Sequence, residues 1–283
     1  MGGGSAAGAP GGRPTLLIGY DVESCPRSKA TVKFLELAPK IHEEYGAPCT
    51  FFVLGRTLLY HLEELRRVAE RYYPDVVDIQ QHTFSHVLFK TVVIAYRGNE
   101  LVRGAPVEVV ECEVSVTSEM LRALLGVECI GLTAPFCYYR GLLDRPDVLE
   151  ALWRCGIRFV RSWGRDERDS LPVSLDVQPF WYDQAVKGYP PILECCIQGW
   201  HDNALKALIR TREEYMDYVR RYIDEVAERG LVWSYCQHDH SSFWNDPEMK
   251  MVEKMIEYAL DRGVRILSYR QFYEEIARER GLL

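Results

Sequence analysis

Short apolar runs alternate with amphipathic stretches along most of the chain. TLLIGY (residues 15–20) is a continuous apolar run and predicts a buried strand. VKFLELAPKIHEEY (residues 32–45) has apolar residues at helical spacing, and PCTFFVLG (residues 48–55) returns to a strand pattern. The same alternation predicts strands at PDVVDIQ, CIGLTA, IRFVRS, PILECCIQ, LVWSYCQ and VRILSY, with amphipathic helices between most of them. Seven or so such alternations predict an α/β fold with a largely parallel sheet covered by helices.

Two segments depart from this rhythm. Residues 90–116 are rich in β-branched and turn residues and predict an inserted hairpin. Residues 164–189 are rich in turn residues and aromatics and predict loops at one end of the sheet. Ligand sites in parallel α/β folds lie at the carboxyl ends of the strands. The residues that carry chemistry are therefore expected directly after each strand.

Composition narrows the class of protein. Apolar residues make up 47% of the 283 residues and charged residues 27%, which is ordinary for a globular protein with a large core. The net charge of −7 argues against nucleic acid or an anionic membrane as the main partner. No run of eighteen apolar residues occurs, so the sequence predicts no membrane span.

The cysteines and the amino-terminal residues bear on location. The nine cysteines are scattered without a CxxC pair, so we expect reduced thiols in a cytoplasmic protein. Residues 1–13 (MGGGSAAGAPGGR) lack the apolar stretch of a signal peptide, and we expect a disordered tail or a cloning scar there. Residues 14–283 are expected to form one domain, and its oligomeric state is left open.

Four predicted strands end in residues that can do chemistry. GYDVES places Asp21 and Glu23 after the first strand, and QHTFSH places His82 and His86 after the third. Two histidines four residues apart lie on one side of a helical turn and can bind a divalent metal together with a carboxylate. The other two strand ends run into LTAPFCYY and SYCQHDHSS. Any one of these residues alone is more often structural, but four suitable strand ends favour a common site.

These motifs resemble those of the polysaccharide deacetylase family, the NodB-type enzymes of carbohydrate esterase family 4. EEYGAPCTFFVLG resembles the family's second strand, and DIQQHTFSH resembles its metal-binding histidine motif. The similarity extends from about Thr15 to the terminal SYRQFYEEI. It implies a distorted (β/α)7-type barrel of mostly parallel strands, formed as one catalytic domain by residues 14–283 with the hairpin inserted.

The resemblance also implies roles for individual residues. Asp21 would be the catalytic base, and His238 the general acid, with His240 as a rival for the latter role. Metal ligands would be Glu23, His82 and His86. Pro135 and Phe136 match the motif whose aromatic residue donates its backbone N–H to the oxyanion. Apart from the resemblance, Trp200 in QGWHDN follows a predicted strand and is a candidate substrate contact. The loop RSWGRDERD offers Asp166 or Asp169 as the residue that orients the histidine acid.

Two departures from the family's pattern are visible. The family's arginine that orients the base is replaced by Thr133, and Glu23 stands where many members have aspartate. The resemblance implies a divalent metal, with zinc first and cobalt or nickel as further options; a metal-free variant stays open. The expected reaction is removal of an N-acetyl group from an amino-sugar substrate inside the cell. The alternatives are hydrolysis of a small linear or cyclic amide, such as a ureide or imide, and a non-catalytic carbohydrate-binding relative.

Overall fold

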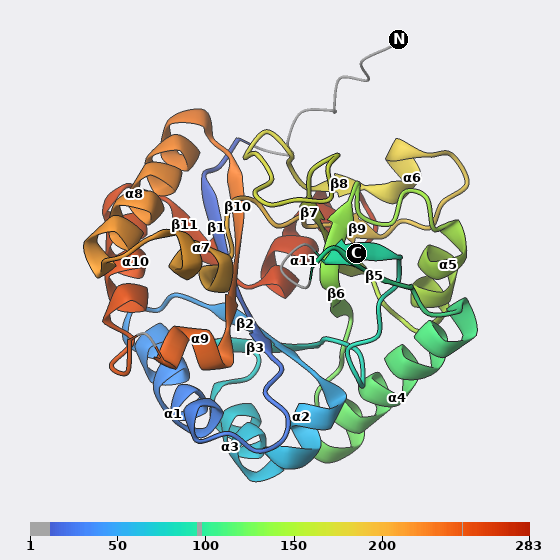
Figure 1. Cartoon of the computed structure of the whole chain (residues 1–283), viewed down its shortest axis with the longest axis horizontal. Helices are drawn as coiled ribbons and strands as arrows, with labels where there is room; N and C mark the ends of the chain where they lie inside the picture. Colours follow the sequence, from blue (N-terminus) through green and yellow to red (C-terminus); the bar gives the residue numbers. More distant parts are fainter. Residues whose placement is uncertain (1–11, 95–97, 245) are drawn as a thin grey trace.

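A curled, mostly parallel sheet forms the centre of the protein, and helices cover its outer face (Figure 1). The computed structural model describes residues 12–94, 98–244 and 246–283. The expected tail at residues 1–13 therefore lies mostly outside the described residues. In the sheet the strand order is β10-β1-β2-β3-β6-β7-β9-β8, and β11 pairs with the first residues of β1 on the side opposite β10. This half-barrel confirms the expected distorted (β/α) barrel.

The strands lie where the apolar runs predicted them. The parallel strands of three or more residues are β1 (Thr15–Val22), β2 (Cys49–Val53), β3 (Val77–Gln81), β6 (Gly131–Tyr139), β7 (Phe159–Arg165), β10 (Val232–His238) and β11 (Arg265–Leu267). The short strands β9 (Leu193–Glu194) and β8 (Phe180–Trp181) complete the edge, where β8 is antiparallel to β9.

Helices surround the outer face of the sheet (Figure 1). The long ones there are α1 (Lys29–Glu44), α3 (Leu62–Tyr72), α4 (Val107–Leu125), α5 (Pro146–Arg154), α8 (Arg212–Arg229) and α10 (Lys250–Asp261). The long helix α11 (Tyr269–Glu279) lies instead within the curl of the sheet and packs against its inner face. The shorter helices are α2 (Gly55–Tyr60), α6 (Tyr182–Ala185), α7 (Asp202–Leu208) and α9 (Asp239–Trp244). None of the described helices has the length and apolar character required to cross a membrane.

Side-chain alternation gives the sheet two different faces. In β1, Leu16, Ile18 and Tyr20 belong to the large core beneath the helices. Leu17, from the same strand, belongs instead to a second cluster with aromatic residues of β2, β7 and α11. Because side chains on a strand alternate between faces, Asp21 shares the face of Leu17. The second cluster fills part of the barrel interior and leaves the carboxyl ends of the strands for the site.

The inserted segment is shorter than the sequence predicted. β4 (Val92–Ile94) and β5 (Glu100–Val102) form the expected antiparallel hairpin. The rest, from Val107 onward, is the first half of α4, so the strand-like interpretation of residues 107–116 was wrong. Val110, Val114, Thr117 and Leu121 are its buried residues, and their spacing is that of a helix face. Burial of this face outweighed the strand propensity of the valines.

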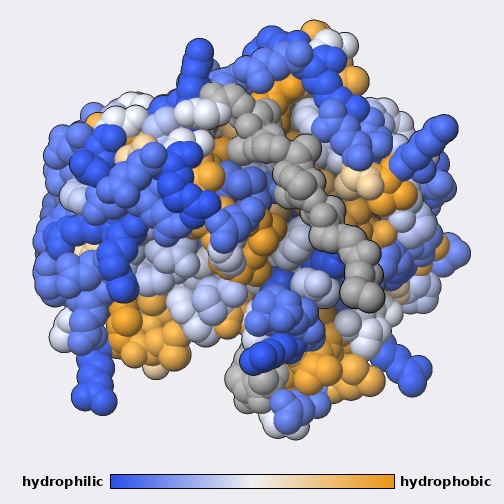
Figure 2. All heavy atoms as spheres, turned by 90° about the horizontal axis from the view of Figure 1, so that it is seen from above, coloured by the Kyte–Doolittle hydropathy of each residue, from blue (hydrophilic) through white to orange (hydrophobic). Residues whose placement is uncertain are grey.

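The view from above shows a surface on which hydrophilic residues predominate and hydrophobic residues form smaller patches (Figure 2). Strongly exposed large hydrophobic residues belong to separate parts of the chain: Leu101 in β5 is 61% exposed, Leu208 in α7 is 59% exposed and Leu283 at the carboxyl end is 63% exposed. Single apolar side chains on a surface are common in globular proteins and need no separate explanation.

Candidate active site

A cavity of about 670 Å³ opens at the carboxyl ends of the parallel strands. Its walls include Asp21 from β1, Phe136 from β6 and His238 from β10. His82 and His86 line it from the segment that follows β3. The residues that the sequence assigned to four separate strand ends therefore surround one space, within the size range of small-molecule sites.

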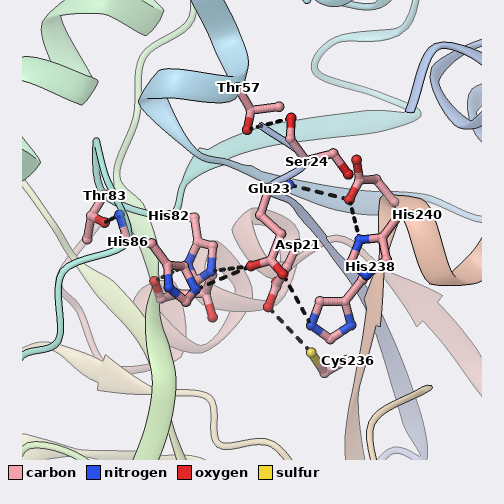
Figure 3. A network of polar contacts seen from close by, with 12 residues as sticks. Asp21, Glu23, Ser24, Thr57, His82, Thr83, His86, Cys236, His238 and His240 are labelled. Atoms are coloured by element: carbon pink, nitrogen blue, oxygen red, sulfur yellow. Dashed lines mark hydrogen bonds and ion pairs between the residues drawn. The ribbon is translucent and has the colours of Figure 1, made fainter. Parts of the chain in front are cut away.

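Glu23, His82 and His86 converge on one point of this cavity (Figure 3). The Oε2 atom of Glu23 lies 3.3 Å from Nε2 of His82 and 3.3 Å from Nε2 of His86. The two imidazole rings stand nearly perpendicular, with their centroids 4.7 Å apart. Burial raises the pKa of Glu23, but its hydrogen bonds with the two histidines lower that pKa well below the usual value overall.

The backbone between the two histidines is a bend, and the expected helical turn was wrong. Thr83 and His86 both have positive φ, 63° and 69°. The carbonyls of Thr83 and Phe84 accept hydrogen bonds from backbone N–H groups at the start of α2. The Ser85 N–H and hydroxyl donate to the carboxylate of Glu113 on α4, at 2.7 Å each. Contacts with two helices therefore hold the bend, and sequence spacing alone does not reveal them.

The donor set fits a divalent metal on chemical grounds. His82 Nδ1 lies 2.9 Å from the carbonyl oxygen of Thr133, which can only accept a hydrogen bond. Nδ1 therefore carries a proton and donates it to this carbonyl, and Nε2, which faces Glu23, is the ring atom that could bind a metal. A carboxylate oxygen and imidazole nitrogens facing one another are favourable when a cation lies between them. A backbone carbonyl behind a ligating histidine is also the usual arrangement at metal sites.

Asp21 is buried and paired with an arginine that sequence reasoning missed. The Arg161 guanidinium, fully buried in β7, donates to Oδ1 of Asp21. Burial by itself would lower the pKa of Arg161, but the Asp21 carboxylate raises it overall. The guanidinium carbon lies 4.5 Å from the Phe52 ring centroid, as in a cation–π contact. A Cβ at Gly19 would collide with this guanidinium, so the strand needs glycine there.

Thr133 stands where the family's arginine was expected, and it contacts the arginine that replaces it. The Thr133 hydroxyl accepts a hydrogen bond from Nε of Arg161 at 2.9 Å. Thr133 and Arg161 are paired across neighbouring strands, which places both side chains on the interior face. Asp21, the expected base, therefore has an arginine partner from β7 in place of β6. The sequence did contain a sign of this contact: Arg161 lies in IRFVRS, which has the pattern of a buried strand, and a buried arginine needs an acidic partner.

His238 lies opposite Asp21 on the neighbouring strand, and its orienting partner is Asp202. The register of β1 and β10 pairs Asp21 with His238. His238 Nδ1 lies 2.6 Å from Oδ1 of Asp202 at the start of α7. The expectation of Asp166 or Asp169 was therefore wrong: Asp166 accepts hydrogen bonds within its own loop, and Asp169 accepts one from the Val93 N–H.

The charged surroundings of His238 favour its protonated form. Burial lowers the pKa of this imidazole, but the carboxylates of Asp202, Glu23 and Asp21 raise it to about 10 overall. His240, the rival for the acid role, is half-buried at the start of α9, with Nδ1 3.2 Å from Asp239 Oδ1. Of the two histidines, His238 is the one that lines the cavity.

Pro135 and Phe136 lie in an irregular part of β6. The register between β6 and β7 shifts between Thr133 and Tyr138. Phe136 has a φ of 65°, and its carbonyl accepts a 3.0 Å hydrogen bond from Nε of Arg165. Pro135 is buried, whereas the Phe136 ring lies in the cavity wall, 5.4 Å from the His86 ring.

Trp200 also lines the cavity, beside α8. Its backbone N–H donates to the Tyr218 hydroxyl at 2.8 Å, which fixes the segment that leads into α7. The aromatic ring of Trp200 is only partly buried. The structure thus brings this predicted substrate contact to the same cavity as the carboxylates and histidines.

Solved structures of other proteins share the fold of this chain. A candidate polysaccharide deacetylase from Mycobacterium smegmatis matches with a TM-score of 0.70 and 17% identity, over 98% of this chain and 95% of that protein. The fold of the chain is that of the polysaccharide deacetylases. No family model matches the chain, and no curated protein matches its sequence. The match in three-dimensional structure thus confirms the resemblance that the motifs indicated, although sequence comparison alone finds none.

Other structures with this deacetylase fold differ in activity. A carbohydrate esterase family 4 pseudoenzyme from Bacillus anthracis matches with a TM-score of 0.56 and 13% identity, over 92% of this chain and 66% of that protein. The peptidoglycan N-acetylglucosamine deacetylase Bc1960 matches with a TM-score of 0.50 and 15% identity, over 93% and 89%. Because the same fold occurs with and without activity, the function of this chain has to be argued from its own site residues.

Proposed function

We propose that the protein is a metal-dependent hydrolase that removes an N-acetyl group from an amino-sugar-containing substrate. The observation that carries the proposal is the convergence of Glu23, His82 and His86 on one point, beside a buried Asp21 and opposite His238. Relatives by fold include deacetylases of carbohydrate substrates. A pseudoenzyme would be expected to lack at least one of these groups.

Glu23, His82 and His86 are the residues that would hold the metal. When bound there, a divalent metal supplies a water of lowered pKa, from about 15.7 toward roughly 7, and polarises the amide carbonyl. The imidazole and carboxylate donors suit zinc, and cobalt or nickel would also fit the set. The Thr133 carbonyl behind His82 would fix the orientation of that ligand.

The remaining steps fall to the chain's own residues. Asp21 accepts the proton of the attacking water, and the hydrogen bond from Arg161 fixes the orientation of its carboxylate. The backbone N–H of Phe136 donates a hydrogen bond to the oxyanion that forms on the substrate carbonyl. His238, oriented by Asp202, donates a proton to the leaving amine. An unprotonated amine anion is a very poor leaving group, so this last transfer is essential.

Trp200 and Phe136 would supply apolar surface for a sugar ring. Both line the cavity, which includes the polar groups of Asn203 and Ser170 as well. Apolar walls with a few well-placed polar groups are typical of small-molecule sites. We further propose that the protein acts in the cytoplasm, which the nine free cysteines support.

A small linear or cyclic amide is the second candidate substrate. It is favoured by the apolar part of the cavity wall, where Ile94, Leu171 and Leu208 contribute. Asp21 and His238 would have the same roles in hydrolysis, and the bond cleaved would be the amide bond of the small molecule. Only the substrate screen described next distinguishes the two.

Two measurements test the proposal. Elemental analysis of the purified protein should find about one divalent metal per chain, and a His82→Ala, His86→Ala double variant should lose it. Acetate release is then measured with N-acetylated sugars and oligosaccharides, and ammonia or acid release with small amides. Hydrolysis of amides alone would select the second candidate. A metal-free protein that refuses added zinc, or a metal-loaded one that binds glycans without hydrolysing them, would overturn the proposal.

A further inference from the structure

A second group of metal-ligating atoms lies beside the first. The sulfur of Cys236 is 3.5 Å from Oδ2 of Asp21, and with His238 these residues bring one ligand atom each within 4.8 Å of one another. Strand register explains the cluster, since Asp21 pairs with His238 and Cys236 precedes His238 by two residues on the same face. All three side chains face the cavity (Figure 3).

The ligand atoms that this group turns toward one another are suited to a cation. Arg161 holds Oδ1 of Asp21, and Oδ2 faces the Cys236 sulfur. Asp202 holds Nδ1 of His238, so that Nε2 remains for another contact. A histidine whose second nitrogen is held by a carboxylate is a common ligand at zinc sites. One sulfur, one imidazole nitrogen and one carboxylate oxygen form a set that zinc binds well.

The second group is distinct from the first in its chemistry. Glu23 separates the two: its Oε2 faces His82 and His86, while its Oε1 lies 4.0 Å from Nε2 of His238. The first group offers only nitrogen and oxygen, whereas the second includes a thiol. Thiolate ligands select zinc and other soft cations over magnesium or calcium.

We propose that Asp21, Cys236 and His238 form a second metal site, which takes zinc or a similar thiophilic cation and inhibits the enzyme when occupied. On binding, the S–H bond of Cys236 breaks, a sulfur–metal bond forms and the proton leaves to solvent, with no change of oxidation state. The inhibitory part rests on the proposed function, because a cation here would remove the base Asp21 and the acid His238 from the reaction. The binding part does not depend on it.

Cobalt separates the two sites spectroscopically. Metal-free full-length protein is titrated with Co²⁺ while near-ultraviolet absorption is recorded, since only a thiolate ligand gives a sulfur-to-cobalt charge-transfer band. We expect the wild type to bind two equivalents and to show the band. The Cys236→Ala variant should bind one equivalent without the band. The His82→Ala, His86→Ala variant should bind one equivalent and keep the band.

Cys137 offers a matched control. It is another buried thiol in the wall of the same cavity, and the Cys137→Ala variant should retain the band. No band in wild-type protein at excess cobalt overturns the proposal, as does a band that survives Cys236→Ala or disappears in Cys137→Ala. Circular dichroism shows whether each variant is folded, and a Cys236→Ser variant replaces Cys236→Ala if that variant is not.

Activity tests the inhibitory part separately. The rate of acetate release is measured with one equivalent of zinc and again with excess zinc. The rate in excess zinc, divided by the rate at one equivalent, should be well below one in the wild type but close to one in Cys236→Ala. If the wild type shows the charge-transfer band but has the same rate in excess zinc, the second site binds metal without inhibiting the enzyme, and only the inhibitory part of the proposal is overturned. A protein that shows the band but hydrolyses no substrate contradicts the proposed function instead.

Discussion

The carboxylate of Asp21 is held by the guanidinium of Arg161, which lies 140 residues later in the chain. Both side chains are buried, and the pair connects β1 with β7 across the interior of the half-barrel. An ionised carboxylate in such a place needs a counter-charge, because an unpaired buried charge is strongly unfavourable. The arrangement also leaves Oδ2 of Asp21 for the cavity side, as the proposed role of a base requires.

Removal of this arginine should therefore cost both stability and activity. We expect Arg161→Met to lower the free energy of unfolding by about 3–5 kcal/mol, because it leaves Asp21 without its partner. Urea denaturation followed by circular dichroism measures this change. A loss below about 1 kcal/mol, as is usual for an exposed ion pair, would show that the pair is not buried in solution.

A swap of two residues tests whether the position of the arginine matters. Thr133 and Arg161 are neighbours on the same interior face, so Thr133→Arg in an Arg161→Thr background returns an arginine close to Asp21. We expect the double variant to recover part of the stability and of the hydrolysis rate that Arg161→Thr loses. If the losses of stability and of rate in the double variant equal the sum of the losses in the two single variants, an arginine at position 133 cannot replace Arg161.

Asp239 should support metal binding from behind Glu23, the proposed ligand. Its fully buried carboxylate accepts hydrogen bonds from the Glu23 N–H, at 3.4 Å, and from the Thr31 hydroxyl. We expect Asp239→Ala to weaken metal affinity by about 10–100-fold, as loss of outer contacts does at other metal sites. Competition with a chelator measures the affinity. His240→Ala removes another partner of the same carboxylate and serves as the control, with little change expected.

The pKa of His238 should depend on Asp202. In metal-free protein the imidazole is expected to titrate near pH 10, since the carboxylates around it outweigh the effect of burial. Asp202→Asn removes the largest favourable contribution, so the pKa should fall by more than one unit. Nuclear magnetic resonance of the histidine ring protons follows the titration. Asp166→Asn is the control, and an equal shift there would contradict the assigned partner.

Acid should destabilise the protein through His42, far from the site. Burial lowers the pKa of this imidazole from 6.5 to about 4, although its hydrogen bond with the Ala47 carbonyl opposes the shift. Between these two values the unfolded chain binds a proton that the folded chain does not, so stability is lost as pH falls from 6.5 toward 4. The expected loss is on the order of 3 kcal/mol.

Denaturation at several pH values compares the wild type with His42→Gln. Glutamine keeps hydrogen-bonding capacity toward Tyr20 and Ala47 but does not titrate. The wild type should lose more stability than the variant across this window. Parallel curves for the two proteins would show that His42 does not carry the effect.

Much of the fold followed from local sequence. The strand at residues 15–20 and the helix at residues 32–45 were confirmed with shifted ends as β1 and α1, because each needs only a hydrophobic pattern of the right period. Residues 107–116 were predicted wrongly, since valines have high strand propensity. Their helical spacing became decisive only when α4 packed against α5 and α3.

The sequence by itself determined which chemical groups the cavity contains. Asp21, Glu23, His82, His86 and His238 were identified because they directly follow or end buried strands, and parallel strands present their carboxyl ends to one side. Only the tertiary structure decided how these groups are supported. Arg161 reaches Asp21, and Asp202 reaches His238, through strand order and side-chain alternation. Such contacts join residues far apart in the chain, and no local pattern encodes which of many buried or charged residues will meet.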